Sequence, residues 1–192
     1  RFMDNQIAPH FIEMIRQDIS SDNSMIDYNL YRDGLSIYTT LNSKIQKYAN
    51  ESVAEHLAEL QKLFDRKWSW NRKKDLLDNL LKKAINSNPE YKAAEKSKQK
   101  AIFDKLYSNK SFVDSIKNIA TTIQVGLVVI EPSTGSVLAM VGSSPKFMSE
   151  HREAKYSLNH AFQIRRQPGS SFKPFVYASA LSKGLTPESI IE

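Results

Sequence analysis

Apolar residues recur every three or four positions along most of this chain, which is the spacing of helices with one buried face. Pro9 can begin a first helix, and Asn42 can cap a long second helix that runs to about Phe64. A last helix is expected to end at Gly184. The pattern therefore predicts helices over residues 9–19, 42–64, 73–85, 89–107, 111–121 and 170–183.

The pattern of strands appears in two places. Residues 122–131 and 136–142 are rich in Val, Ile and Leu, and Pro132–Gly135 between them favours a turn. Both runs are apolar on both faces, so we expect this hairpin to lie centrally in a covered sheet. A shorter hairpin is predicted from residues 30–32 and 35–40, around an Asp-Gly turn. Helices combined with an antiparallel sheet make α+β the expected fold class.

Positive charge is concentrated in the middle of the chain. Residues 61–110 carry 14 Lys/Arg against 6 Asp/Glu, a net charge of +8, whereas the whole chain carries +6. The simplest interpretation is a solvated helical insertion that Trp68 and Trp70 anchor to its neighbours. A sharper interpretation is a contact with anionic lipid headgroups, an acidic wall polymer or a partner protein. Nucleic acid is not expected, because no nucleic-acid motif is visible and the basic residues are spread around the helices.

The composition narrows the chemistry that this chain of 192 residues can perform. It contains no cysteine, which excludes disulfides and thiol chemistry and is compatible with an oxidising compartment outside the cytoplasm. No run of about 18 apolar residues is present, so the sequence predicts no membrane-spanning helix. We expect no metal and no other cofactor, because the four histidines lack metal-ligand spacing: His10, His56, His151 and His160.

A serine followed by a lysine three residues later places both side chains on one face of a helix, where the amine can reach the hydroxyl. The chain contains three such pairs: Ser97/Lys100, Ser143/Lys146 and Ser170/Lys173. The first pair lies in a charged run that is typical of a solvated helix face. Ser143 of the second pair is followed by Ser144 and Pro145, and a proline there favours a loop. The third pair alone has a glycine directly before the serine and an apolar helix after it.

Ser170 and Lys173 are therefore the candidate catalytic residues. The first turn of a helix has unsatisfied N–H groups, so the Ser170 N–H can face a developing oxyanion. The positive end of the helix disfavours a protonated Lys173 and makes this lysine a better base. The alternative is that Ser170 is an ordinary helix N-cap and Lys173 a surface lysine.

The residues around Ser170 resemble a known active-site region. Residues 166–177 read Arg-Gln-Pro-Gly-Ser-Ser-Phe-Lys-Pro-Phe-Val-Tyr, similar to the active-site serine region of class A penicillin-binding proteins, the bifunctional peptidoglycan synthases. Residues 34–46 resemble the strand and helix that open the transpeptidase domain of that family, and residues 126–142 resemble its first hairpin. Residues 8–13 resemble the segment that follows the family's glycosyltransferase domain. The resemblance covers most of the chain outside its middle segment.

The resemblance implies the N-terminal part of a penicillin-binding, serine β-lactamase-like transpeptidase domain with a helical insertion. The family's other catalytic elements, a Ser-x-Asn loop and a Lys-Thr-Gly strand, follow the active-site helix and are expected beyond Glu192. The remainder of the transpeptidase domain is therefore an expected partner. The implied division is an inter-domain linker (1–33), a lead-in strand and first helix (34–64), a basic helical insertion (65–121), and the first hairpin with the active-site helix (122–192).

The function that the resemblance implies is peptidoglycan D,D-transpeptidation, with Ser170 as nucleophile and Lys173 as base. Stem peptides ending in D-Ala-D-Ala would be the substrates, and β-lactams would be inhibitors. The alternatives are a β-lactamase or β-lactam sensor of the same fold, from which the lead-in segment and Pro174 differ, and a non-enzymatic adaptor that uses the basic helices. The implied location is the outer face of the bacterial cytoplasmic membrane, in the periplasm, with the anchor outside this sequence.

Overall fold

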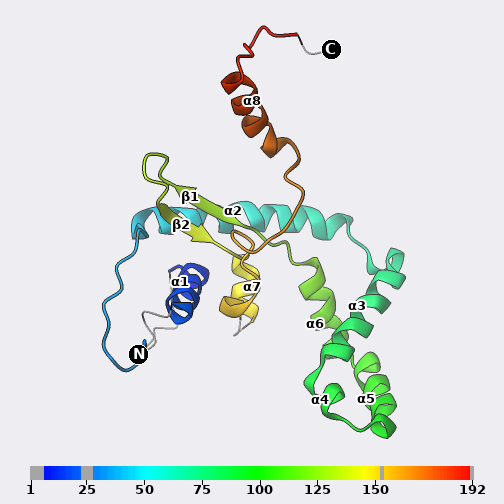
Figure 1. Ribbon diagram of the computed structural model, residues 1–192. Coiled ribbons are helices and arrows are strands. Elements are labelled where there is room, and N and C mark those ends of the chain that lie inside the picture. The colour runs from blue at the N-terminus through cyan, green and yellow to red at the C-terminus, as the bar shows by residue number, and fades with distance from the viewer. Residues whose placement is uncertain (1–6, 23–27, 152–153, 191–192) are drawn as a thin grey trace.

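The computed structural model describes residues 7–22, 28–151 and 154–190 (Figure 1). The structure confirms the predicted α+β class. Among the described residues, none of the helices combines the length and the apolar character that a membrane span requires. Strands β1 (Leu127–Ile130) and β2 (Val137–Val141) are accompanied by short 3-10 turns η2 (Trp70–Arg72), η3 (Ala154–Tyr156) and η4 (Gly169–Phe172). The α-helices are α1 (Pro9–Ser21), α2 (Ser43–Lys67), α3 (Lys74–Ser87), α4 (Pro89–Ala93), α5 (Lys96–Ser108), α6 (Lys110–Thr121), α7 (Pro145–Glu150) and α8 (Lys173–Ser182).

The centre of the structure is the antiparallel β1–β2 hairpin, which packs against α1 and α2. Figure 1 shows α2 running along the hairpin and α1 lying beside β2. Ala8 and Phe11 from the start of α1 pack on Met140 of β2, and all three side chains are buried. Half-buried apolar residues surround them: Met14, Ile15, Leu41, Val137 and Ala161.

The hairpin is shorter and less covered than the sequence predicts. β1 begins at Leu127, later than predicted. Before it, the backbone N–H of Ile123 donates to the side-chain Oε1 of Gln61 over 2.9 Å and not to a neighbouring strand. At Gly126 the backbone of His160 passes so close that a Cβ would collide with it. The prediction that both faces are covered is wrong within the described residues, since Val128 and Ile130 are exposed on a two-stranded sheet.

The shorter hairpin predicted from residues 30–32 and 35–40 is not formed. The side chains of Asn29 and Asp33 bond the local backbone instead: Asn29 Oδ1 accepts from the Tyr31 N–H, and Asp33 Oδ2 accepts from the Asn29 N–H. The segment after this turn is extended but unpaired as a strand, and Tyr38 is 94% exposed. It meets the sheet only at its end, where Thr40 Oγ1 donates to the Val137 carbonyl.

Gln46 ties α2 to the sheet with a fully buried side-chain amide. Its Nε2 donates to the Met140 carbonyl over 3.0 Å, and its Oε1 accepts from the Met140 N–H over 2.8 Å. The amide thus satisfies both backbone groups of one β2 residue, as a neighbouring strand would. Gln46 shares the buried face of α2 with Ala49 and Val53.

Replacing Gln46 by methionine is expected to lower the free energy of unfolding by about 2–6 kcal/mol. Methionine keeps the volume but leaves the buried N–H and C=O of Met140 without partners, at about 1–3 kcal/mol for each. Urea unfolding followed by circular dichroism measures the change. Gln61→Met is the matched control, because Gln61 makes comparable backbone bonds in a half-exposed position that water can enter. An equal loss in both variants would contradict this role of Gln46.

The middle of the chain is helical, as predicted, and extends away from the hairpin (Figure 1). The predicted helix over 89–107 is instead two helices, α4 and α5, with the break at Ala94 and Glu95. α3 packs against α4, α5 and α6, and Tyr107 of α5 donates a 2.8 Å hydrogen bond to Asp78 of α3. That bond raises the pKa of Tyr107, while bonds from Lys82 and Tyr107 lower the pKa of Asp78.

The divisions of the chain into segments at residues 33, 64 and 121 stay predictions.

Candidate functional site

The structure separates the three serine–lysine pairs by their surroundings. Ser97 and Lys100 are exposed on α5. Ser143 is buried, and its Oγ donates to Gln124 Oε1 over 2.7 Å. The serine after it caps the short helix α7, which begins at a proline. The loop predicted at the second pair is instead a turn into a six-residue helix that contains Lys146 and that the sequence pattern did not reveal.

Ser170 and Lys173 lie in the connection that leads into α8. Ser170 belongs to η4, and Lys173 is the first residue of α8, so the prediction that Ser170 begins an α-helix is wrong. The cause is Pro174, which has no N–H and cannot make the α-helical bond to the Ser170 carbonyl. That carbonyl accepts from the Lys173 N–H instead, which closes a 3-10 turn. Residues three apart eclipse in a 3-10 turn, so both residues share one face.

The backbone at Gly169 sets up this turn. Gly169 has φ +54°, a left-handed conformation that side-chain-bearing residues rarely adopt, and the Ser171 N–H bonds the carbonyl of Pro168. The Ser170 N–H donates no hydrogen bond in the part of the chain that the structure describes. It is therefore available to an acceptor outside the chain.

The surroundings of the Ser170–Lys173 pair are open. Both residues are exposed, and no side-chain hydrogen bond joins them in the described structure. α8 projects away from the hairpin in Figure 1. Its apolar side chains are exposed around the helix: Phe175 (68%), Val176, Tyr177 and Leu181. A helix that is apolar on all sides is typical of a buried position, so α8 has the composition of a core helix and the exposure of a surface one.

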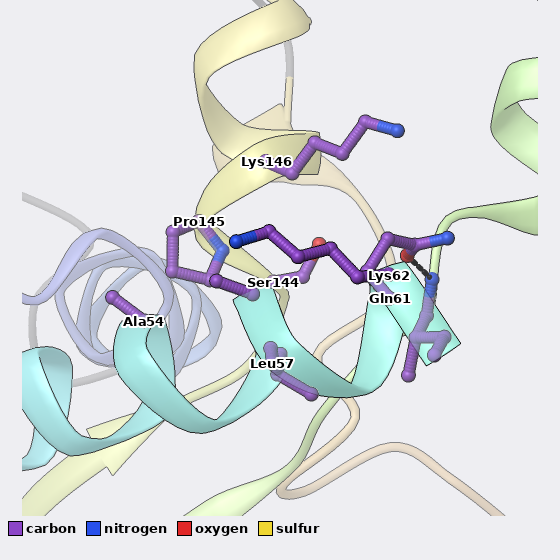
Figure 2. A pocket seen from close by; sticks show the side chains of 9 residues that line it. Ala54, Leu57, Gln61, Lys62, Ser144, Pro145 and Lys146 are labelled. Atoms are coloured by element: carbon purple, nitrogen blue, oxygen red, sulfur yellow. Dashed lines mark hydrogen bonds between the residues drawn. The ribbon is translucent and has the colours of Figure 1, made fainter. Parts of the chain in front are cut away.

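A cavity of about 310 Å³ lies elsewhere, between α2 and α7 (Figure 2). Its walls are largely apolar, and the polar groups of Gln61 and Ser144 that reach it already bond the backbone. The ammonium groups at its rim come from Lys62 and Lys146. Neither Ser170 nor Lys173 lines this cavity, so it is not part of the predicted site.

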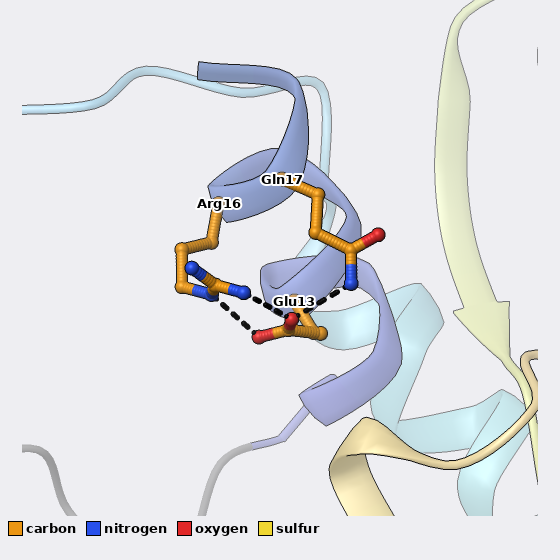
Figure 3. A network of polar contacts seen from close by, with 3 residues as sticks. All are labelled: Glu13, Arg16 and Gln17. Atoms are coloured by element: carbon orange, nitrogen blue, oxygen red, sulfur yellow. Dashed lines mark hydrogen bonds and ion pairs between the residues drawn. The ribbon is translucent and has the colours of Figure 1, made fainter. Parts of the chain in front are cut away.

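Two polar clusters involve side chains of α1. Arg16 and Gln17 hold the Glu13 carboxylate (Figure 3), and the hydrogen bond from Arg16 lowers the pKa of Glu13 against the opposing effect of burial. Burial lowers the pKa of His10, and His160 lowers it further. His160 Nδ1 contacts the Gly142 carbonyl over 2.9 Å. The described residues contain no group of three or more His, Asp or Glu side chains placed to hold a metal ion.

Comparisons with known proteins point to one family. Residues 125–192 match the penicillin-binding protein transpeptidase domain. Penicillin-binding protein 1A of Rickettsia bellii is 27% identical over 95% of this chain, and that of Escherichia coli K12 is 26% identical over 96%. Penicillin-binding protein 1A of Neisseria gonorrhoeae is 45% identical over 69 residues, which are 36% of this chain and 8% of that protein. The chain spans 27% of the length of the first two relatives, and no solved structure matches it.

Proposed function

We propose that the chain acts in peptidoglycan cross-linking through an acyl-enzyme on Ser170. The chain is a relative of the class A penicillin-binding proteins, and its residues 125–192 match their transpeptidase domain. The observation that carries this proposal is the turn that precedes α8. One short backbone segment there presents the Ser170 hydroxyl, an unused Ser170 N–H and the Lys173 amine on the surface. A nucleophile, an oxyanion donor and a base are the groups that acyl transfer requires.

In the proposed reaction, Lys173 takes the hydroxyl proton while Ser170 Oγ attacks the carbonyl carbon of the penultimate D-alanine in a stem peptide. The Ser170 N–H supplies half of the oxyanion hole. The peptide C–N bond then breaks, and the terminal D-alanine leaves as an amine that has accepted the proton. An amine of a neighbouring strand attacks the resulting ester, forms the cross-link and returns the serine to its hydroxyl form.

A β-lactam enters the same steps by the opening of its ring amide. The ring nitrogen stays attached to the acyl group, so the leaving group does not diffuse away and the serine remains blocked. The complete protein would thus be a β-lactam target, and relatives named penicillin-binding protein 1A favour this over a β-lactamase. We place it at the outer face of the cytoplasmic membrane, in the periplasm, together with a glycosyltransferase activity outside this sequence.

Labelling of the complete protein with a fluorescent penicillin, followed by proteolysis and mass spectrometry, tests the proposal. We expect one acylated peptide, and we expect it to contain Ser170. Release of D-alanine from a peptide ending in D-Ala-D-Ala is the accompanying activity. A stable adduct on Ser143 or Ser97, or no adduct together with no D-alanine release, would remove the proposed function. An adduct that hydrolyses within seconds would favour the β-lactamase alternative.

A further inference from the structure

The junction between α2 and α3 gathers positive charge. Five basic residues lie within nine positions there, and no acidic residue lies among them. In Figure 1 this junction is the bend at the end of α2, away from the hairpin. We call this surface the basic corner and define it by Arg66, Lys67, Arg72, Lys73 and Lys74.

The cations of the basic corner are not held in ion pairs within the described part of the chain, and the carboxylates that flank the segment are those of Asp65 and Asp75. None of its five side chains makes an ion pair among the described residues, and all five are exposed. By contrast, three lysines elsewhere on α3 and α5 make ion pairs: Lys82 with Asp78, Lys98 with Glu95 and Lys105 with Glu90. Like charges held close together repel, so the corner keeps a positive potential that favours an anionic partner.

Apolar side chains accompany the basic corner. Two leucines are exposed on the last turns of α2, Leu60 (39%) and Leu63 (53%). A third is exposed on the first turn of α3, Leu76 (41%). Lys67 follows Leu60 and Leu63 on the same stripe of α2. The corner therefore offers leucine side chains beside lysine and arginine, as helices that lie on a membrane surface do.

The tryptophans of the corner are used internally. Trp68 stacks on Phe64 with ring centroids 5.1 Å apart, and Trp70 meets Trp68 edge-on at 5.3 Å. Trp68 Nε1 is buried without a hydrogen-bond partner. These rings hold the bend between α2 and α3 and leave no free aromatic platform on which nucleic-acid bases could stack. The aromatic cluster thus shapes the corner, and the charges and leucines face outward.

We propose that the basic corner docks on an anionic phospholipid surface. The phosphate groups of the lipids would meet the five cations, while the boundary of the acyl chains would cover Leu60, Leu63 and Leu76. A soluble acidic polymer would match the charges but would leave the leucines in water. The proposal is independent of the chemistry at Ser170, because its test measures binding and not acylation.

The test uses the whole chain and vesicles of phosphatidylcholine, with or without about one third phosphatidylglycerol, at low ionic strength. The chain has only two tryptophans, and both lie at the bend, so intrinsic fluorescence reports directly on the corner. We expect vesicle binding and a fluorescence change with the anionic vesicles, both weakened by salt. Equal binding to pure phosphatidylcholine, or no binding to either vesicle, would overturn the proposal.

A matched pair of triple variants locates the binding surface. The variant R72Q/K73Q/K74Q removes three charges from the corner, and K82Q/K98Q/K105Q removes three charges from ion-paired positions. We expect the first to weaken partitioning about 100-fold and the second less than about 3-fold. Equal weakening would mean that overall charge drives binding and would overturn the assignment to the corner. If the first variant loses helix content by circular dichroism, R66Q/K67Q replaces it, with an expected loss of about 30-fold.

Leu63→Ser separates a lipid surface from a soluble polyanion. We expect this substitution to weaken vesicle binding about 5-fold and to leave binding to soluble polyphosphate unchanged. If polyphosphate binds the chain as tightly as vesicles do and Leu63→Ser changes neither, the corner recognises an acidic polymer, and the lipid proposal is wrong.

Discussion

Replacing Ser170 by alanine in the complete protein is expected to abolish covalent labelling by a fluorescent penicillin. The substitution removes the oxygen that would form the acyl bond, and loss of a catalytic serine lowers rates by about 10⁴- to 10⁶-fold. Time-resolved labelling read on a gel, with the intact mass measured in parallel, gives the result. Because Ser170 is exposed and its side chain makes no hydrogen bond in the described structure, the variant should fold normally. A loss of label would therefore report on chemistry.

Two serines of the same spacing serve as controls. Ser97 is exposed on α5, and Ser143 is buried in a contact with Gln124. Neither Ser97→Ala nor Ser143→Ala should change the labelling rate by more than about 2-fold. The second control also tests indirect effects, since it loses a buried hydrogen bond near the sheet. Retained labelling of the Ser170→Ala protein would show that another residue is the nucleophile and would end this assignment.

The helices were predictable because their signals are local. Asn42 accepts from the N–H groups of residues 44 and 45 as an N-cap, and Pro9 begins α1. The turn before α8 also has local signals, although the prediction of an α-helix from residue 170 did not use them. Gly169 adopts a positive φ, and Pro174 lacks the N–H that an α-helical bond to the Ser170 carbonyl needs. The 3-10 turn could thus have been read from the sequence by asking where each backbone group finds its partner.

The sheet was harder to predict because its contacts are distant in sequence. Gln46 looks like a surface residue, yet its amide pairs with Met140, 94 residues away. The buried residues of α2 are Gln46, Ala49 and Val53, so a polar side chain shares this face with two apolar ones. Residues 30–40 failed as a hairpin because the side chains of Asn29 and Asp33 bond the local backbone, and Tyr38 in the extended segment after this turn stays exposed.

Replacing Lys173 by arginine is expected to leave the fold intact and to slow acylation by about 100- to 10,000-fold. Arginine keeps the positive charge and nearly the same length, but it does not give up its proton in proteins, so it cannot act as a base. The measurement is the second-order rate of penicillin acylation of the complete protein, with circular dichroism as the check on folding. Lys146→Arg is the matched control, because Lys146 has the same spacing from Ser143 but bonds Asn118 and lies away from Ser170.

The two variants at Ser170 and Lys173 distinguish chemistry from charge. If Lys173 only attracts an anionic substrate or steadies an oxyanion, arginine would serve nearly as well, and acylation would stay within a few-fold of the unmodified protein. If Lys173 is the base, the Lys173→Arg protein should still bind penicillin reversibly while forming the acyl bond slowly. Near-normal acylation by Lys173→Arg together with complete loss in Ser170→Ala would keep Ser170 as the nucleophile and assign the proton transfer to a group other than Lys173.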